Sequence, residues 1–227
     1  MAALMAAVTM LLTGCGTASL SVPTEQGTLT VTALTDDAVR VQRTAAGTAV
    51  PQLEELVYTR QVRRPRGTVR QYGDSAVLRL RGLRVCYDRR SSLLTFRDGS
   101  GNVLLQEAAT SVQPSEVQGV PCVEVTGSFL SPADEHLYGT GQFQDGFLDI
   151  RGLTRRLTQV NTQIAIPLVL SSKGYGLLWN NYGLTDFNPA DHVLPLTAAS
   201  LDDDEQVVDA TGTAGNRRER RRFGSFT

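Results

Sequence analysis

The sequence is poor in the residues that build metal centres. Its 227 residues include only three cysteines and two histidines, and neither His136 nor His192 lies at metal-ligand spacing from a cysteine. Zinc sites in proteins depend on such clusters of cysteine and histidine. The sequence therefore predicts no metal site and no cofactor.

Lysine is also scarce, since Lys173 is the only one and the remaining basic residues are arginines spread along the chain. The formal net charge is -1, and no basic face of the kind that binds phosphate backbones is predicted. We expect no nucleic-acid partner. The arginine-rich run at residues 217–222 is expected to form a charged edge strand or loop, which discourages aggregation between sheets.

Long helical periodicity is absent, and only residues 53–57 have the spacing of a short helix. Short runs of alternating or β-branched residues are common instead, separated by turn residues such as Asp98-Gly99. Loops are expected at residues 60–67 and 184–195. The predicted strands are residues 29–34, 38–41, 79–87, 93–96, 102–105, 122–129, 164–170, 175–180 and 206–212.

Many short strands broken by turns about every ten residues are typical of an antiparallel β-sandwich. The sequence predicts an all-β protein with one such sandwich. Cys86 and Cys122 lie in predicted strands. A disulfide between them and two buried free thiols are both compatible with the sequence.

The N-terminus has the features of an export signal. Residues 1–12 form an apolar run too short to span a bilayer as a stable helix. The run ends in Leu12-Thr13-Gly14-Cys15, which resembles a bacterial lipobox, where the signal is cut before the cysteine and Cys15 is lipidated. No Lys or Arg precedes the run, which departs from the usual signal pattern. A cleaved signal with an incidental cysteine is the alternative.

We therefore expect residues 1–19 to be a lipoprotein-type signal and lipobox. The protein is then exported to the bacterial cell envelope, on the periplasmic or the outer surface, and meets the membrane only through its lipid anchor.

The middle of the chain carries an ordered series of motifs. In order they are Glu135-His136-Leu137-Tyr138-Gly139-Thr140-Gly141, then Asp149-Ile150-Arg151-Gly152, then Ile166-Pro167-Leu168, and finally Ser172-Lys173-Gly174-Tyr175-Gly176-Leu177-Leu178-Trp179. This order resembles the N-terminal domain of glycoside hydrolase family 31, the α-glucosidases and α-xylosidases. The resemblance extends from about residue 28 to residue 188.

The resemblance implies a galactose-mutarotase-like β-sandwich that packs on a catalytic (β/α)8 barrel and lends a loop to the rim of the sugar site. The implied partners are that barrel and, weakly, an α-linked oligosaccharide. For each rim position, turn capping or interface packing is the alternative role. The positions that match the rim are Gln142, Phe143, Gln144, Asp145, Gln159, Asn161 and Thr162.

Retaining hydrolysis needs two carboxyl groups about 5 Å apart, and the resemblance implies that both come from the barrel, with the nucleophile in a Trp-x-Asp-Met segment. Here Trp179, expected in the core, is the only tryptophan, and Asn180 and Asn181 follow it. All methionines lie within the first ten residues. We expect no catalytic residue in this chain. Residues 20–227 are predicted to be the N-terminal β-sandwich domain of an α-glycosidase, truncated before the catalytic barrel.

Two other hypotheses stay open: a free-standing carbohydrate-binding or mutarotase-like lipoprotein, and a structural or interaction lipoprotein. A mutarotase needs catalytic histidine and glutamate side chains in a cleft, and neither His136 nor His192 has an evident partner in the sequence. The sequence does not distinguish xylose from glucose specificity, because the discriminating pocket belongs to the barrel.

Overall fold

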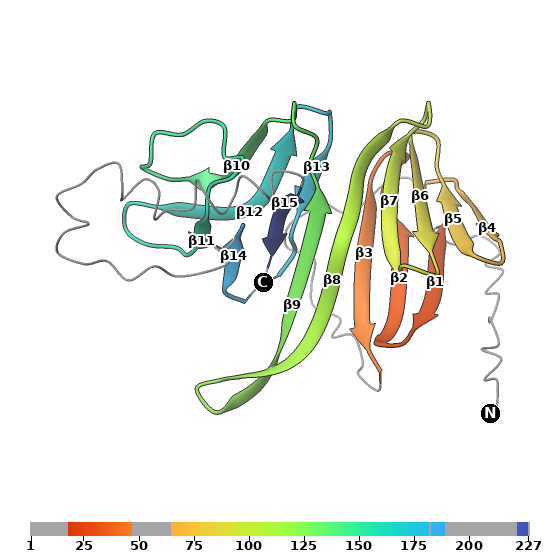
Figure 1. Ribbon diagram of the computed structural model, residues 1–227, viewed down its shortest axis with the longest axis horizontal. Helices are drawn as coiled ribbons and strands as arrows, with labels where there is room; N and C mark the ends of the chain where they lie inside the picture. Colours follow the sequence, from red (N-terminus) through yellow and green to blue (C-terminus); the bar gives the residue numbers. More distant parts are fainter. Residues whose placement is uncertain (1–17, 47–64, 182, 189–221, 227) are drawn as a thin grey trace. The chain divides into compact units, whose positions relative to one another are not determined.

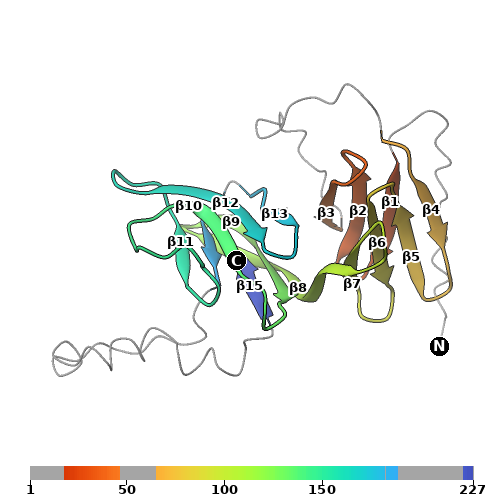
Figure 2. The same cartoon turned by 90° about the horizontal axis from the view of Figure 1, so that it is seen from above.

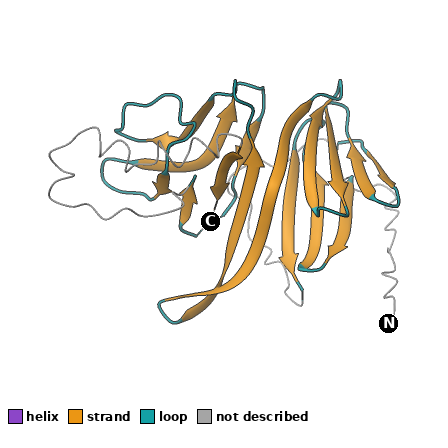
Figure 3. Ribbon diagram, in the orientation of Figure 1, coloured by secondary structure: helices purple, strands orange, loops and turns teal. Residues whose placement is uncertain are grey.

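The computed structural model describes residues 18–46, 65–181 and 183–188, together with the backbone of residues 222–226. These residues form strands, turns and loops and contain no α-helix (Figure 3). The all-β, antiparallel prediction is confirmed. The predicted helix at 53–57, the predicted strand at 206–212 and residues 1–17 of the predicted signal segment lie outside the described residues. The predicted end of that segment at residue 19 is wrong, because Ser19 already begins the first strand and pairs with Thr32.

The chain divides into two compact units, Met1–Leu104 and Leu105–Thr227. The boundary falls just after the start of β8 (Val103–Val117). Each unit is described by itself.

The first unit has two layers (Figure 2). One layer is a three-stranded sheet in the order β1-β2-β3, and in the other layer β4 to β7 are neighbours in sequence order. The strands are β1 (Ser19–Thr24), β2 (Gly27–Ala33), β3 (Val39–Ala45), β4 (Thr68–Gln71), β5 (Ser75–Arg79), β6 (Leu83–Asp88) and β7 (Leu93–Asp98).

The core of this unit follows from alternation, because every second side chain of a strand points to the same face. In β1 and β2 the inward positions include Leu20 and Leu29, and in β5 and β6 they include Leu78 and Val85. These four residues are at most 1% exposed and belong to one apolar cluster. Burial of such side chains stabilises the unit by about 1.5–3 kcal/mol each.

The second unit contains a sheet in the order β10-β12-β13 and five further strands in the order β11-β14-β15-β9-β8 (Figure 1). Its buried apolar side chains include Phe129, Leu137, Val169 and Phe187. The strands after β8 are β9 (Val120–Leu130), β10 (Leu137–Gln142), β11 (Arg155–Leu157), β12 (Ile164–Ser171), β13 (Gly176–Leu178), β14 (Thr185–Phe187) and β15 (Arg222–Phe226).

Two sequence predictions about local structure are wrong. Residues 79–87 are not one strand, because Leu80 donates a backbone hydrogen bond to Leu83 across a tight turn that separates β5 from β6. Residues 184–195 are not all loop, because β14 lies within them and pairs with β11. In both cases pairing with a neighbouring strand outweighs the local signal.

The charged run at 217–222 lies mostly outside the described residues. Its last residue, Arg222, begins β15, which pairs with β14 on one side and β9 on the other. Arg222 therefore starts an interior strand rather than the expected edge strand.

Candidate functional site

The predicted rim starts at a bulge in β10. Residues Gly139, Thr140 and Gly141 all have positive φ angles, of 116°, 62° and 103°, and the register against β12 shifts between the two glycines. A Cβ at Gly139 would lie 2.4 Å from the Leu168 carbonyl oxygen, and one at Gly141 2.0 Å from the Ile164 carbonyl oxygen. Only glycine fits these two positions.

Thr140, between the glycines, is fully buried and β-branched, and positive φ is rare for such a residue. A conformation of this kind persists only where its surroundings hold it.

The residue that holds the bulge is Arg155, at the start of β11. Its Nη1 donates to the Gly139 carbonyl oxygen at 3.2 Å and to Thr140 Oγ1 at 2.7 Å. Its Nε and Nη2 donate to Asp145 Oδ2 at 2.9 Å and 2.5 Å. The guanidinium also lies 4.5 Å from the centre of the Phe143 ring. The Arg155 side chain is 5% exposed, so this charge is buried, and it donates four hydrogen bonds.

These contacts divide the four predicted rim residues of the first segment into two groups, those that contact Arg155 and those that do not. Phe143 and Asp145 contact Arg155 and support the loop, while Asp145 Oδ1 also accepts from the Phe147 amide at 3.2 Å. Gln142 and Gln144 are exposed. Their amides remain accessible to a ligand.

The second predicted segment is a short turn before β12. Gln159 Oε1 accepts from the Ala165 amide at 3.0 Å, which is the turn-capping role considered as its alternative. Asn161 and Thr162 are exposed in the turn closed by the bridge between Val160 and Gln163.

A second buried polar cluster centres on Glu135, which is 1% exposed. Its carboxylate accepts from Ser131 Oγ at 2.5 Å, from Ser171 Oγ and from the Tyr175 hydroxyl at 2.8 Å. Burial first, and then the hydrogen bond to Glu135, raises the pKa of Tyr175 well above its usual range. The cluster ties the segment before β10 to the hairpin of β12 and β13.

The structure gives His136 a partner that was not evident in the sequence. His136 Nδ1 lies 2.7 Å from Asp149 Oδ2, while Asp149 Oδ1 accepts from the amides of Leu137 and Arg151 at 3.0 Å and 3.1 Å. Burial raises the pKa of Asp149, but the hydrogen bonds from His136 and the two amides outweigh it, and the net pKa is lowered. His192 lies outside the described residues.

An apolar strip runs along the outer face of the β10-β12-β13 sheet. In β12 the residues Ile164, Ile166 and Leu170 alternate with inward-facing ones and are 46%, 47% and 49% exposed. Leu178 of β13, at 36%, extends the strip, since its register partner is Leu168. Gln142 pairs with Ile164, so the first rim segment borders the strip.

Trp179, expected in the core, is half-buried. Its ring covers Gly127 of β9, where an added Cβ would lie 3.0 Å from the ring. The tryptophan therefore packs within the second unit.

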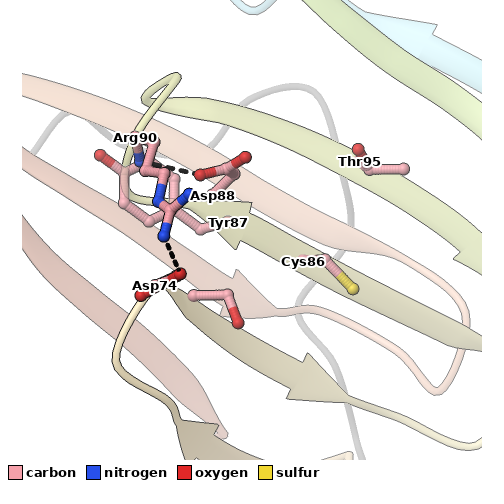
Figure 4. Close-up of a pocket in the computed structure, with 7 residues that line it drawn as sticks. Asp74, Cys86, Tyr87, Asp88, Arg90 and Thr95 are labelled. Carbon is pink, nitrogen blue, oxygen red and sulfur yellow. Dashed lines mark hydrogen bonds and ion pairs between the residues drawn. The ribbon is translucent and has the colours of Figure 1, made fainter.

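A hollow of about 250 Å³ in the first unit is lined by both strands and turns. Figure 4 shows Arg90 joined to Asp74 at 2.6 Å and, through its backbone amide, to Asp88. Cys86 lines the same hollow. The charged groups of the hollow thus bind one another, and the hollow contains none of the predicted rim residues.

Cys86 and Cys122 are both free thiols. Cys86 is half-buried and Cys122 is exposed, so both alternatives are wrong: the two residues form neither a disulfide nor a pair of buried thiols. No group of three or more potential metal ligands occurs within the described ranges. The described part of the chain also has no helix that is long and apolar enough to cross a membrane.

Sequence reasoning missed Arg155, Glu135 and Asp149 as the residues that organise this region. Arg155 and Arg156 are identical neighbours in the sequence, yet one is buried and the other is exposed in a pair with Asp186. No local signal separates them.

Comparison with known proteins identifies relatives among glycosidases. An uncharacterised family 31 glucosidase of Pseudescherichia vulneris is 35% identical over 127 residues, which are 50% of this chain and 24% of the relative. An α-xylosidase of Saccharolobus solfataricus is 36% identical over 100 residues, which are 40% of this chain and 13% of the relative. The chain thus spans a quarter or less of the length of these relatives.

The crystal structure of a family 31 α-xylosidase from Xanthomonas citri is similar in fold, with a TM-score of 0.65 and 27% identity. The similarity covers 79% of this chain and 20% of that structure. The family model described as the glycosyl hydrolase 31 N-terminal galactose mutarotase-like domain matches residues 28–188. The chain belongs to this family of glycosyl hydrolase 31 N-terminal domains.

Proposed function

We propose that this chain is the non-catalytic N-terminal part of a family 31 α-glycosidase, an α-xylosidase or an α-glucosidase. It packs on the catalytic (β/α)8 barrel and contributes Gln142, Gln144, Asn161 and Thr162 to the rim of the sugar site, where it contacts an α-linked oligosaccharide weakly.

The observation that carries the proposal is the apolar strip of β12 and β13 beside Gln142. Contiguous exposed apolar surface on a soluble domain marks an interaction site. The chain matches only a small part of two relatives, one named as a glucosidase and the other as an α-xylosidase. The partner that fits the strip best is therefore the catalytic part of such an enzyme.

The state of three carboxylates in the second unit supports a non-catalytic role. Asp145 is bound to Arg155, Asp149 to His136 and two amides, and Glu135 to three hydroxyls. Carboxylates held in this way act as structural acceptors.

The association is testable by complementation. The chain is co-expressed with the segment of the Pseudescherichia vulneris relative that follows its matched region, and the two are expected to copurify. Ile166→Lys combined with Leu170→Lys should abolish copurification, whereas the control Val117→Lys combined with Val120→Lys should not, because these valines are exposed on the β8–β9 hairpin. If the chain with Ile166→Lys and Leu170→Lys still copurifies, the strip is not the contact surface.

The non-catalytic role is tested by assaying the chain alone with p-nitrophenyl α-xyloside. We expect no turnover above background. Turnover by the wild-type chain that disappears when Asp149 or Glu135 is replaced would contradict the non-catalytic role.

We also propose export to the bacterial envelope with lipidation at Cys15, a residue outside the described ranges. Mass spectrometry of the N-terminal peptide from a bacterial host should detect an acylated Cys15, and Cys15→Ala should move the protein from the membrane fraction to the soluble fraction.

The pairing of His136 with Asp149 bears on one alternative, a mutarotase-like activity. This pair is exposed, with the His136 side chain 59% accessible, whereas a mutarotase needs its histidine in a cleft. Interconversion of xylose anomers, followed by polarimetry, should be unchanged by addition of the chain. An acceleration that His136→Gln removes would favour the alternative.

A further inference from the structure

The buried guanidinium of Arg155 joins parts of the rim that are far apart in the sequence. It contacts the bulge through Gly139 and Thr140 and the following loop through Phe143 and Asp145. Its own strand, β11, leads directly into the turn that carries Asn161 and Thr162. One side chain therefore connects the bulge and the first predicted rim segment to the strand that precedes the second segment.

The geometry of these contacts requires arginine. Four hydrogen bonds are donated by the three guanidinium nitrogens Nε, Nη1 and Nη2, and the guanidinium carbon lies over the Phe143 ring. A lysine ammonium has three donors at one point and no planar face. It can pair with Asp145 or with the bulge, but it cannot hold both and also cover Phe143.

Gln142 and Gln144 are exposed and alternate with Phe143 and Asp145, whose side chains contact Arg155. Their backbone positions are thereby set before any ligand arrives. A ligand that meets fixed amides loses less affinity to ordering of the site.

We propose that Arg155 is the positioning residue of the rim, which holds Gln142 and Gln144 ready to hydrogen-bond the hydroxyls of an α-linked oligosaccharide. This inference rests on the proposed function, because it assigns a sugar to that rim. Arg155 itself does not touch the sugar.

The test uses the full chain and an α-linked xylosyl-glucose disaccharide as the probe. Nuclear magnetic resonance follows the side-chain amides of Gln142 and Gln144 during the titration, and hydrogen exchange follows the Phe147 amide. The test variant is Arg155→Lys. The matched control is Arg156→Lys, which changes the adjacent arginine, whose pairing with Asp186 is exposed.

In Arg155→Lys we expect at least tenfold faster exchange at Phe147 and at least fivefold weaker sugar binding. Arg156→Lys should match the wild type in both measurements. Asp145→Asn provides a second variant if Arg155→Lys does not fold. It removes one charged partner and should change both measurements in the same direction by a smaller factor.

The outcomes separate the two proposals. Sugar binding that Arg155→Lys and Asp145→Asn leave unchanged would refute the positioning role alone, even if loop exchange becomes faster. A wild-type chain in which the sugar shifts neither Gln142 nor Gln144 would refute the proposed rim, and the positioning role with it.

Discussion

The two units bury different kinds of side chain. Of the 18 buried apolar residues among those described, 12 belong to the first unit, whereas all seven buried polar or charged residues belong to the second. Those seven are Glu107, Ser131, Glu135, Thr140, Arg155, Ser171 and Thr185.

This difference indicates how each unit is specified. An apolar core accepts many packings of similar volume, whereas a buried polar network requires particular partners in particular places. The predicted rim lies in the second unit, around a bulge that apolar packing alone would not hold. The same kind of substitution should therefore change the free energy of unfolding by different amounts in the two units.

The largest effect is expected from Arg155→Ala. It leaves the Gly139 carbonyl oxygen and the buried Thr140 hydroxyl without their donor and Asp145 without its charged partner, and each buried group left unsatisfied costs about 1–3 kcal/mol of the free energy of unfolding. Trp179, the only tryptophan, lies in the second unit, so its fluorescence in a urea titration measures this loss.

The control is Arg156→Ala, since that side chain is 64% exposed in its pair with Asp186. Exposed pairs contribute at most about 1 kcal/mol. Equal losses for the two arginines would show that burial of Arg155 does not distinguish them.

The next effect concerns the core of the first unit. Leu78 is fully buried there, and Leu78→Ala should cost about 2–5 kcal/mol through lost burial and the cavity left behind. Leu78→Met keeps the volume and should cost less than about 1.5 kcal/mol. Circular dichroism during urea unfolding measures both, and a Leu78→Met cost as large as that of Leu78→Ala would contradict the tolerance of this core.

Glu135→Gln makes the corresponding volume-conserving change in the second unit. The amide replaces one acceptor oxygen with a donor, so one of the hydroxyls of Ser131, Ser171 and Tyr175 loses its partner, at a cost of about 1–3 kcal/mol. Trp179 fluorescence in urea measures the change. Glu124→Gln, on the exposed part of β9, should be neutral, and a neutral Glu135→Gln would remove the contrast between the units.

The smallest effect is a pH dependence from Asp149. Its pKa in the folded protein is lowered from the ordinary value of 3.8, so its contribution to stability is complete well above that value and is lost as the pH falls through the lower folded-state pKa. The stability difference between the wild type and Asp149→Asn should therefore shrink between about pH 5 and pH 2. Chemical unfolding across this pH range measures the difference in stability. A difference that grows on acidification would contradict a lowered pKa for Asp149.

Much of the fold could be predicted because strand alternation and turn residues are local signals. The hairpin of β2 and β3 and the hairpin of β7 and β8 follow from such patterns. Residues 79–87 show the limit of alternation, because the same pattern continues through the turn between β5 and β6. For the site, the motif order located the segment from Gln142 to Asp145, but it did not reveal which of these side chains face solvent.

The sequence by itself determined the all-β class and the family, and it suggested the segment that we propose as the rim, because these depend on residue types and their order along the chain. Only the tertiary structure decided that Arg155 is buried while Arg156 is exposed, and that Asp149 meets His136. Burial and partnership depend on residues brought together from distant strands, and no neighbouring residue in the sequence encodes them.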